Sequence, residues 1–167
     1  MDHQVIMELS AYDRWATGNI FAAAAGLSPD LLNQQTGTGY GGIFETLVHL
    51  VAADVIWMSR LHGSSPTALA QPSDFASLED VHRRWVALHD DWALFMDRLP
   101  ESGLNTHVSY QNTRGVPFNR PVWHILLHMV NHGTHHRSEL SEMLTIHGRP
   151  HTALDMHDYL ARIGRVP

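Results

Sequence analysis

The chain has 167 residues, a formal net charge of −6, 14 histidines and no cysteine, and all 11 of its basic residues are arginine. This length predicts one domain over residues 1–167 with a substantial hydrophobic core. The absence of cysteine excludes disulfides, cysteine-ligated metal sites and a thiol nucleophile. The modest basic content and the lack of a membrane-length apolar run predict no nucleic-acid or membrane partner, and we expect a cytoplasmic protein.

The first half of the chain carries the pattern of two long helices. Apolar residues recur at helical spacing over residues 2–25, and Gly26 is suited to end that helix. Ser28 and Pro29 predict the start of a short helix that ends near residue 35. A second long helix is predicted over residues 43–62, and its apolar side chains cover nearly its whole circumference, which indicates deep burial.

Two further long helices are predicted in the second half, separated by a short hairpin. The third helix spans residues 78–99, and the fourth runs from residue 121 to 147, with a short tail helix near 157–163. Residues 106–111 and 116–118 resemble two strands around a turn, with the second limited to a sheet edge by Pro117. The expected buried stripe of the third helix is Val81, Trp85, Leu88, Trp92 and Phe95. These elements predict an all-α four-helix bundle with a short hairpin between the third and fourth helices.

The fourth helix concentrates histidine at helical spacing. His124, His128, His132 and His136 are four residues apart, so neighbouring rings lie on one helix face and two of them can ligate one ion. A helical wheel turns His132 and His136 toward the apolar face, and Gly133 between them would let another backbone or a ligand approach. The pair formed by His128 and His132 is the second choice, and hydrogen-bonded core histidines are the alternative without metal.

His49 is the candidate third ligand, because it is the one histidine inside the second helix. The residues alone leave open whether it faces a site or a plain polar seam between helices. Three histidines on two helices would suit Zn²⁺, Ni²⁺ or Fe²⁺ and leave positions open for water or substrate. The scattered histidines are expected at the surface or in local hydrogen bonds: His3, His62, His82, His89, His107, His147, His151 and His157.

The order and spacing of several segments resemble the DinB/YfiT-like family of metal-binding helix bundles. The segment around Trp15 is similar to a first-helix motif of that family, and His49 followed by Trp57 is similar to a second-helix motif. Residues 131–137, Asn-His-Gly-Thr-His-His-Arg, are similar to its Asn-His-x-x-x-His-Arg signature, and Asp155 and Tyr159 match a C-terminal pattern. At positions 138–139 the chain has Ser-Glu where the family often has Gly-Gln.

The resemblance implies an up-down-down-up bundle, a homodimer, and a metal ion bound by His49, His132 and His136. It also implies thiol chemistry, because better understood branches of the family are maleylpyruvate isomerases and S-transferases that use mycothiol, bacillithiol or glutathione. A protein without cysteine would take its thiol from outside.

Three functions follow from these observations. The first is a metal-dependent transferase or isomerase that uses a low-molecular-weight thiol; the second is a non-catalytic metal-binding stress or sensor protein; the third is a structural dimeric bundle. Arg137 could hold the carboxylate of a thiol or form a surface or intersubunit salt bridge. Glu45 could orient a ligand, act as a base, or simply be solvated. The tryptophans are expected to anchor the core or a dimer interface: Trp15, Trp57, Trp85, Trp92 and Trp123.

Overall fold

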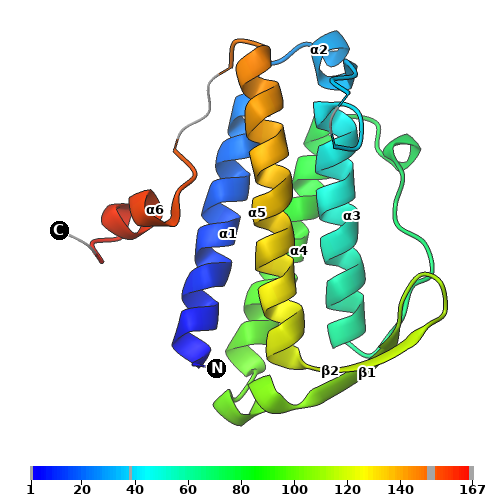
Figure 1. Cartoon of the computed structure of the whole chain (residues 1–167), viewed down its shortest axis with the longest axis vertical. Coiled ribbons are helices and arrows are strands. Elements are labelled where there is room, and N and C mark those ends of the chain that lie inside the picture. The colour runs from blue at the N-terminus through cyan, green and yellow to red at the C-terminus, as the bar shows by residue number, and fades with distance from the viewer. Residues whose placement is uncertain (1, 38, 150–152, 166–167) are drawn as a thin grey trace.

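The computed structural model describes residues 2–37, 39–149 and 153–165. In this part of the chain the predicted predominance of helix is confirmed, and four long helices lie side by side (Figure 1). The long helices are α1 (His3–Ala24), α3 (Ile43–Leu61), α4 (Leu78–Arg98) and α5 (Val122–Ile146). The short helical segments are α2 (Pro29–Asn33), α6 (Met156–Arg162) and the 3₁₀ turns η1 (Pro72–Asp74) and η2 (Glu101–Asn105).

The helices begin where side chains can pair with the free N–H groups of the first turn. The Asp2 carboxylate accepts hydrogen bonds from the N–H groups of Gln4 at 2.7 Å and Val5 at 3.4 Å. The Ser77 hydroxyl accepts one from the N–H of Asp80 at 3.3 Å at the start of α4. Such caps contribute about 1 kcal/mol each, which explains why the predicted starts agree closely with the observed ones.

A two-stranded antiparallel sheet connects α4 to α5. Strand β1 (His107–Gln111) pairs with β2 (Pro117–Pro121), and Tyr110 lies opposite Phe118. The second strand is longer than predicted because Pro121, expected in the first helical turn, has an extended backbone and ends β2. The strand therefore leads directly into α5 and fixes where the histidine-rich helix begins.

The helices differ in direction along the bundle. In Figure 1 the chain rises along α1 and α5 and descends along α3 and α4, so a long connection returns from the end of α3 to the start of α4. Helix α5 packs against both α1 and α3, and α3 also packs against α4. Helix α5, the last of the four long helices, thus lies between α1 and α3.

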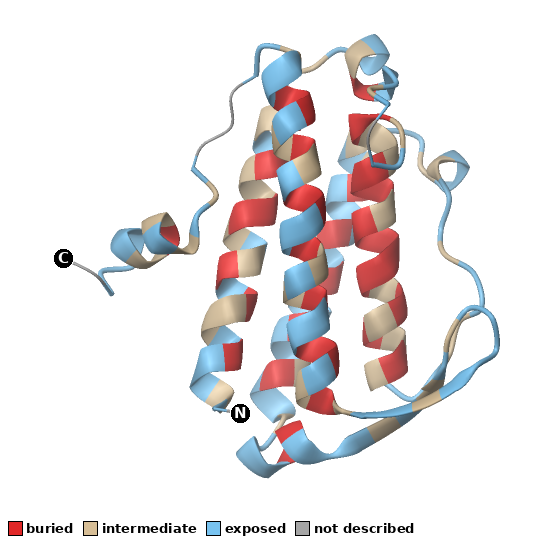
Figure 2. Cartoon of the chain, in the orientation of Figure 1, coloured by how far each residue is buried: buried red, intermediate tan, exposed pale blue. Residues whose placement is uncertain are grey.

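The core lies between the four long helices, where buried positions face inward (Figure 2). One cluster gathers around Ile20, Leu47 and Leu140, and another around Met58, Leu104 and Leu126. The predicted stripe of α4 is buried at four of its five positions: Val81, Trp85, Leu88 and Trp92.

The exception is Phe95, which is only partly buried, because the neighbouring Met96 fills the interior instead. Trp85 and Trp92 are buried as expected, and the other three tryptophans are partly buried.

Candidate metal centre

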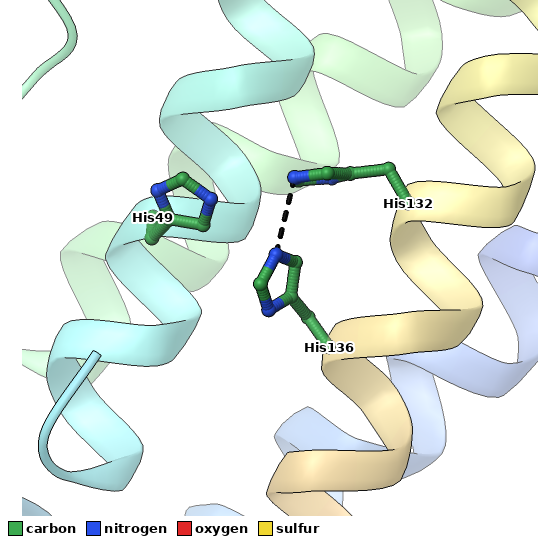
Figure 3. A group of neighbouring side chains, drawn as sticks. All are labelled: His49, His132 and His136. Atoms are coloured by element: carbon green, nitrogen blue, oxygen red, sulfur yellow. Dashed lines mark hydrogen bonds between the residues drawn. The ribbon is translucent and has the colours of Figure 1, made fainter. Parts of the chain in front are cut away.

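Three histidine side chains from two packed helices lie close together (Figure 3). His49 comes from α3, whereas His132 and His136 come from successive turns of α5. One ring nitrogen from each lies within 4.8 Å of the others. The Nε2 atoms of His132 and His136 are 3.1 Å apart, and the ring centroid of His49 is 4.8 Å from that of His136. The structure therefore brings together the three residues selected from the sequence and the resemblance.

The environment keeps two of these imidazoles neutral. Burial is the largest of the effects that lower the pKa of His132 to about 3, and the neighbouring His136 is the second largest. Burial and, to a smaller extent, His136 lower the pKa of His49 to about 4 against an opposing effect of Glu139. Each ring therefore keeps an unprotonated nitrogen at neutral pH, which is the form that ligates metal ions.

Two ring nitrogens in this group are buried without a hydrogen-bond partner. They are Nε2 of His49 and Nδ1 of His132. Leaving a buried polar atom unpaired costs about 1–3 kcal/mol, so a bound group that pairs with it is favoured. The donor set of three imidazoles suits borderline transition metal ions such as Zn²⁺.

Glu139 fixes the orientation of His136, a role that the sequence analysis missed. Its Oε2 atom lies 2.8 Å from Nδ1 of His136, and its Oε1 atom lies 3.2 Å from Nε2 of His135. When the N–H at Nδ1 of His136 donates a hydrogen bond to this carboxylate, Nε2 is the unprotonated nitrogen and its lone pair is directed toward His132. The spacing of three residues from His136 was a usable signal, since such residues are neighbours on a helix.

His135, His136 and Glu139 also form a group with ligand atoms within 4.8 Å of one another. The contacts of both rings with the Glu139 carboxylate account for the short distances, and His135 is largely exposed.

Tyr40 is a second neighbour that sequence reasoning did not find. Its ring stacks on the ring of His49 with centroids 3.6 Å apart and an interplanar angle of 16°. Gly39 and Gly41 flank it with φ of 57° and 121°, conformations that favour glycine. The glycines let the loop turn so that the phenol ring covers His49 while 56% of the residue stays exposed.

The structure corrects both expectations for Arg137. It is 2% exposed, so it is not a surface residue, and its guanidinium forms an ion pair with Asp13 of α1. It also donates hydrogen bonds to the hydroxyls of Thr17 at 3.1 Å and Thr134 at 2.9 Å. With these partners, the side chain fastens α5 to α1 behind the histidines and is not directed at a ligand.

Gly133 also has a different role from the one expected. A methyl group there would lie 2.6 Å from Nη1 of Arg137 and would collide with the Asp13 carboxylate. The absent side chain therefore makes room for the buried ion pair. It does not provide access for a ligand.

Glu45 caps the start of α3. Its Oε2 atom accepts a hydrogen bond from the N–H of Gly42 at 3.1 Å, and its Oε1 atom accepts one from the side chain of Gln35 at 3.1 Å. The residue is partly buried and lies one turn before His49. Its carboxylate is thus held in place, which differs from the freely solvated side chain considered as the alternative.

His89 is the clear exception among the histidines expected at the surface. It is 8% exposed, and its Nε2 atom has no hydrogen-bond partner. Burial lowers its pKa to about 4, with smaller effects of Arg14 and Arg137. Together with the buried Asp54, it lines a cavity of about 20 Å³ between the helices. His89 lies four residues after Trp85 and three before Trp92, so the helical spacing placed it on the buried face, a signal that the sequence analysis missed.

The remaining histidines lie outside the triad. His128 is exposed and packs edge-on against Trp57, with ring centroids 4.8 Å apart, so the second-choice pair with His132 is not part of the group. His62, His82, His107 and His157 are exposed as expected, while His3 and His147 are partly buried. His151 lies outside the described residues.

The sequence model of the DinB family matches residues 1–163, nearly the whole chain. The chain belongs to the DinB family. It is also 26% identical over 160 residues to the protein DinB of Bacillus subtilis (strain 168), an alignment that covers 92% of each chain. Membership of the DinB family agrees with the resemblance drawn from the ordered motifs.

Glu139 lies where the family resemblance leads one to expect glutamine, so the hydrogen bond to His136 is supplied here by a carboxylate. Within the described ranges, none of the helices combines the length and apolar character needed to cross a membrane.

Proposed function

We propose that His49, His132 and His136 hold a divalent transition metal ion, and that the protein uses it in a transferase or isomerase reaction with an external low-molecular-weight thiol. The observation that carries the proposal is the meeting of three ring nitrogens, from α3 and α5, within 4.8 Å. The unpaired Nε2 of His49 supports it, because a bound ion would supply the missing partner. Zn²⁺, Ni²⁺ and Fe²⁺ all suit such a donor set.

The chain itself would hold and orient the reacting groups. A divalent ion at three protein ligands supplies a Lewis acid with positions open to a thiol, and it lowers the pKa of that thiol. Glu139 holds the ring of His136 in one orientation and tautomer through the 2.8 Å hydrogen bond. Tyr40 shields one face of His49 from water. Since the sequence has no cysteine, the thiol must be a substrate.

The proposal also includes three features of the assembly. We infer that residues 1–167 form a single DinB-like domain, that its helices follow an up-down-down-up order, and that two copies form a homodimer. The directions of the helices in Figure 1 support the second of these. Sedimentation of the purified protein would test the third.

The deciding experiment measures metal content in untagged protein, as purified and after reconstitution with each of the three ions. We expect about one ion per chain in the wild type and a large loss in His132→Ala and His136→Ala. His124→Ala is the matched control, because His124 is exposed on the same helix and outside the triad. Absence of stoichiometric metal in every preparation would overturn the metal site.

A second measurement separates an enzyme from a binding protein. Mycothiol, bacillithiol and glutathione are each mixed with an electrophile, and loss of free thiol is followed with loaded protein, with metal-free protein and with the loaded His124→Ala control. We expect consumption of at least one thiol that requires bound metal. Stoichiometric metal without consumption of any thiol would refute the transferase and isomerase proposal and favour the sensor or stress protein.

A further inference from the structure

A cleft of about 420 Å³ opens beside His49, between the start of α3 and the connection that follows it. Its size falls within the range of small-molecule pockets, about 300–1,000 Å³. Apolar surface dominates the lining, which includes Tyr40 and Val48 on one side and Leu69 and Pro72 on the other. The cleft therefore has the dimensions and the polarity to take up the body of a small ligand next to the candidate metal centre.

The charged groups around the cleft are acidic. Glu45 lines it, and Glu139 lies at the neighbouring His136. None of the described residues that line the cleft is an arginine. The nearest guanidinium along α5, that of Arg137, is buried against Asp13 and so is not available to an anion. A carboxylate or phosphate entering the cleft would lose water, meet Glu45 and find no cationic side chain, and Glu139 would offset part of the charge of the ion proposed at the triad.

The exposed ring of Tyr40 supplies an aromatic surface at the opening. One face of the phenol stacks on His49, and 56% of the residue remains exposed to solvent. Leu69 is partly buried in the connection between α3 and α4, outside the main core clusters. An aromatic ring could pack between these two side chains, where stacking contributes about 0.5–1.5 kcal/mol beyond burial of area.

We propose that this cleft selects a ligand with an uncharged, aromatic or apolar body and rejects a carboxylate or phosphate there, so a thiol that carries carboxylates, such as glutathione, would have to hold them outside the cleft. The inference rests on the proposed function in one respect, which is that the reacting group of the ligand lies at the histidine triad. Carboxylates and phosphates are disfavoured by Glu45 and by the lack of an arginine in the described lining. Aromatic or apolar groups are favoured by contacts with Tyr40, Leu69 and their apolar neighbours.

The test compares three thiols that differ only in the part that would occupy the cleft. They are phenylmethanethiol, its 4-carboxylate, and 2-sulfanylethanol, and each is titrated by calorimetry into zinc-reconstituted protein. We expect phenylmethanethiol to bind about tenfold more tightly than either of the others. Equal or tighter binding of the carboxylate overturns the inference, and so does equal binding of 2-sulfanylethanol.

Variants locate the effect in the cleft. Glu45→Gln retains an amide for capping and should reduce the discrimination against the carboxylate severalfold, whereas Glu142→Gln, at an exposed position of α5, should not. Leu69→Asp should weaken phenylmethanethiol about tenfold. Leu94→Asp adds the same charge at a residue that is 54% exposed on α4 and should leave binding unchanged. Identical behaviour of each variant and its control would refute the assignment to this cleft.

The metal content of the same samples keeps the two proposals separate. Stoichiometric zinc with the wrong order of thiol affinities overturns the cleft proposal alone. Absent zinc excludes zinc as the ion of this site, and the order of affinities for the metal-free protein then tests the cleft by itself.

Discussion

Replacing Gly133 with alanine tests the buried ion pair behind the histidines. The added methyl group would lie 2.6 Å from Nη1 of Arg137 and against the Asp13 carboxylate, both of which are fixed in the packed interface of α1 and α5. Separating a buried pair costs about 3–5 kcal/mol, and alanine recovers about 1 kcal/mol through its higher helix propensity. We expect a net loss of about 2–4 kcal/mol in the free energy of unfolding.

Thermal and denaturant unfolding measure this loss. For a domain of this size, about 2–4 kcal/mol corresponds to a fall in Tm of roughly 5–15 °C. Gly18→Ala is the matched control, because Gly18 also lies inside a long helix but its added methyl group would be 3.5 Å from Trp85, an ordinary contact. That variant should gain up to about 1 kcal/mol.

A Gly133→Ala protein as stable as the wild type would refute the reasoning. A second check uses the background Asp13→Ala, Arg137→Met, in which there is no ion pair to disturb. The cost of the alanine should largely disappear there, since the two effects share one interaction. An undiminished cost would show that the close approach to the ion pair is not its origin.

Three further predictions concern charge. Glu139→Ala should weaken metal binding about 10–100-fold, because the His136 ring loses its hydrogen-bond partner; competition with a chelator measures it. Lowering the pH from 7.5 to 4.5 should destabilise the metal-free wild type by about 2–3 kcal/mol more than His89→Leu, since the His89 pKa of about 4 lies below the ordinary 6.5. Asp54→Asn should raise stability most at high pH, because burial raises the pKa of Asp54 well above its usual value and ionisation of the folded state is costly. Denaturant titrations across pH measure the last two.

Glu142→Ala should leave metal affinity unchanged, and a fall equal to that of Glu139→Ala would contradict the orienting role. For His89, the unfolded chain takes up protons below pH 6.5 before the folded one does, so parallel pH profiles of wild type and variant would contradict its burial in neutral form. For Asp54, the folded state holds its proton to higher pH than the unfolded chain does, so the stability of the wild type falls as the pH rises. If the stability gain of Asp54→Asn were the same at low and high pH, the raised pKa of Asp54 would be contradicted.

The sequence carried enough information to predict most of the scaffold and the inward pair of the site. Glycine, proline and capping residues mark the ends of the long helices, and these signals act within a few residues of the chain. The wheel identified His132 and His136 because both lie toward a stripe of buried residues, including Met129 and Leu140. Local spacing was thus sufficient wherever the relevant contacts lie on one helix.

The features that were missed depend on contacts between distant segments. Arg137 and Asp13 are 124 residues apart, so their pairing is set by the packing of α5 on α1. Tyr40 reaches His49 through the path of a loop, which periodicity does not describe. His89 is different: its spacing places it on the buried face of α4, where it faces a small cavity with a mainly apolar lining, and its polarity led to the expectation of a solvated side chain.

The triad lies on helices, whereas one side of the cleft is formed by the connection between α3 and α4, and this separation has an evolutionary consequence. His49, His132 and His136 are fixed on packed helices, whereas Leu69 and Pro72, in the connection between α3 and α4, lie outside the main core clusters. Replacements at such positions can alter which ligand enters without disturbing the ligands of the ion. A lineage could therefore diversify its substrates by changing residues 69–72 while the same ion chemistry is retained.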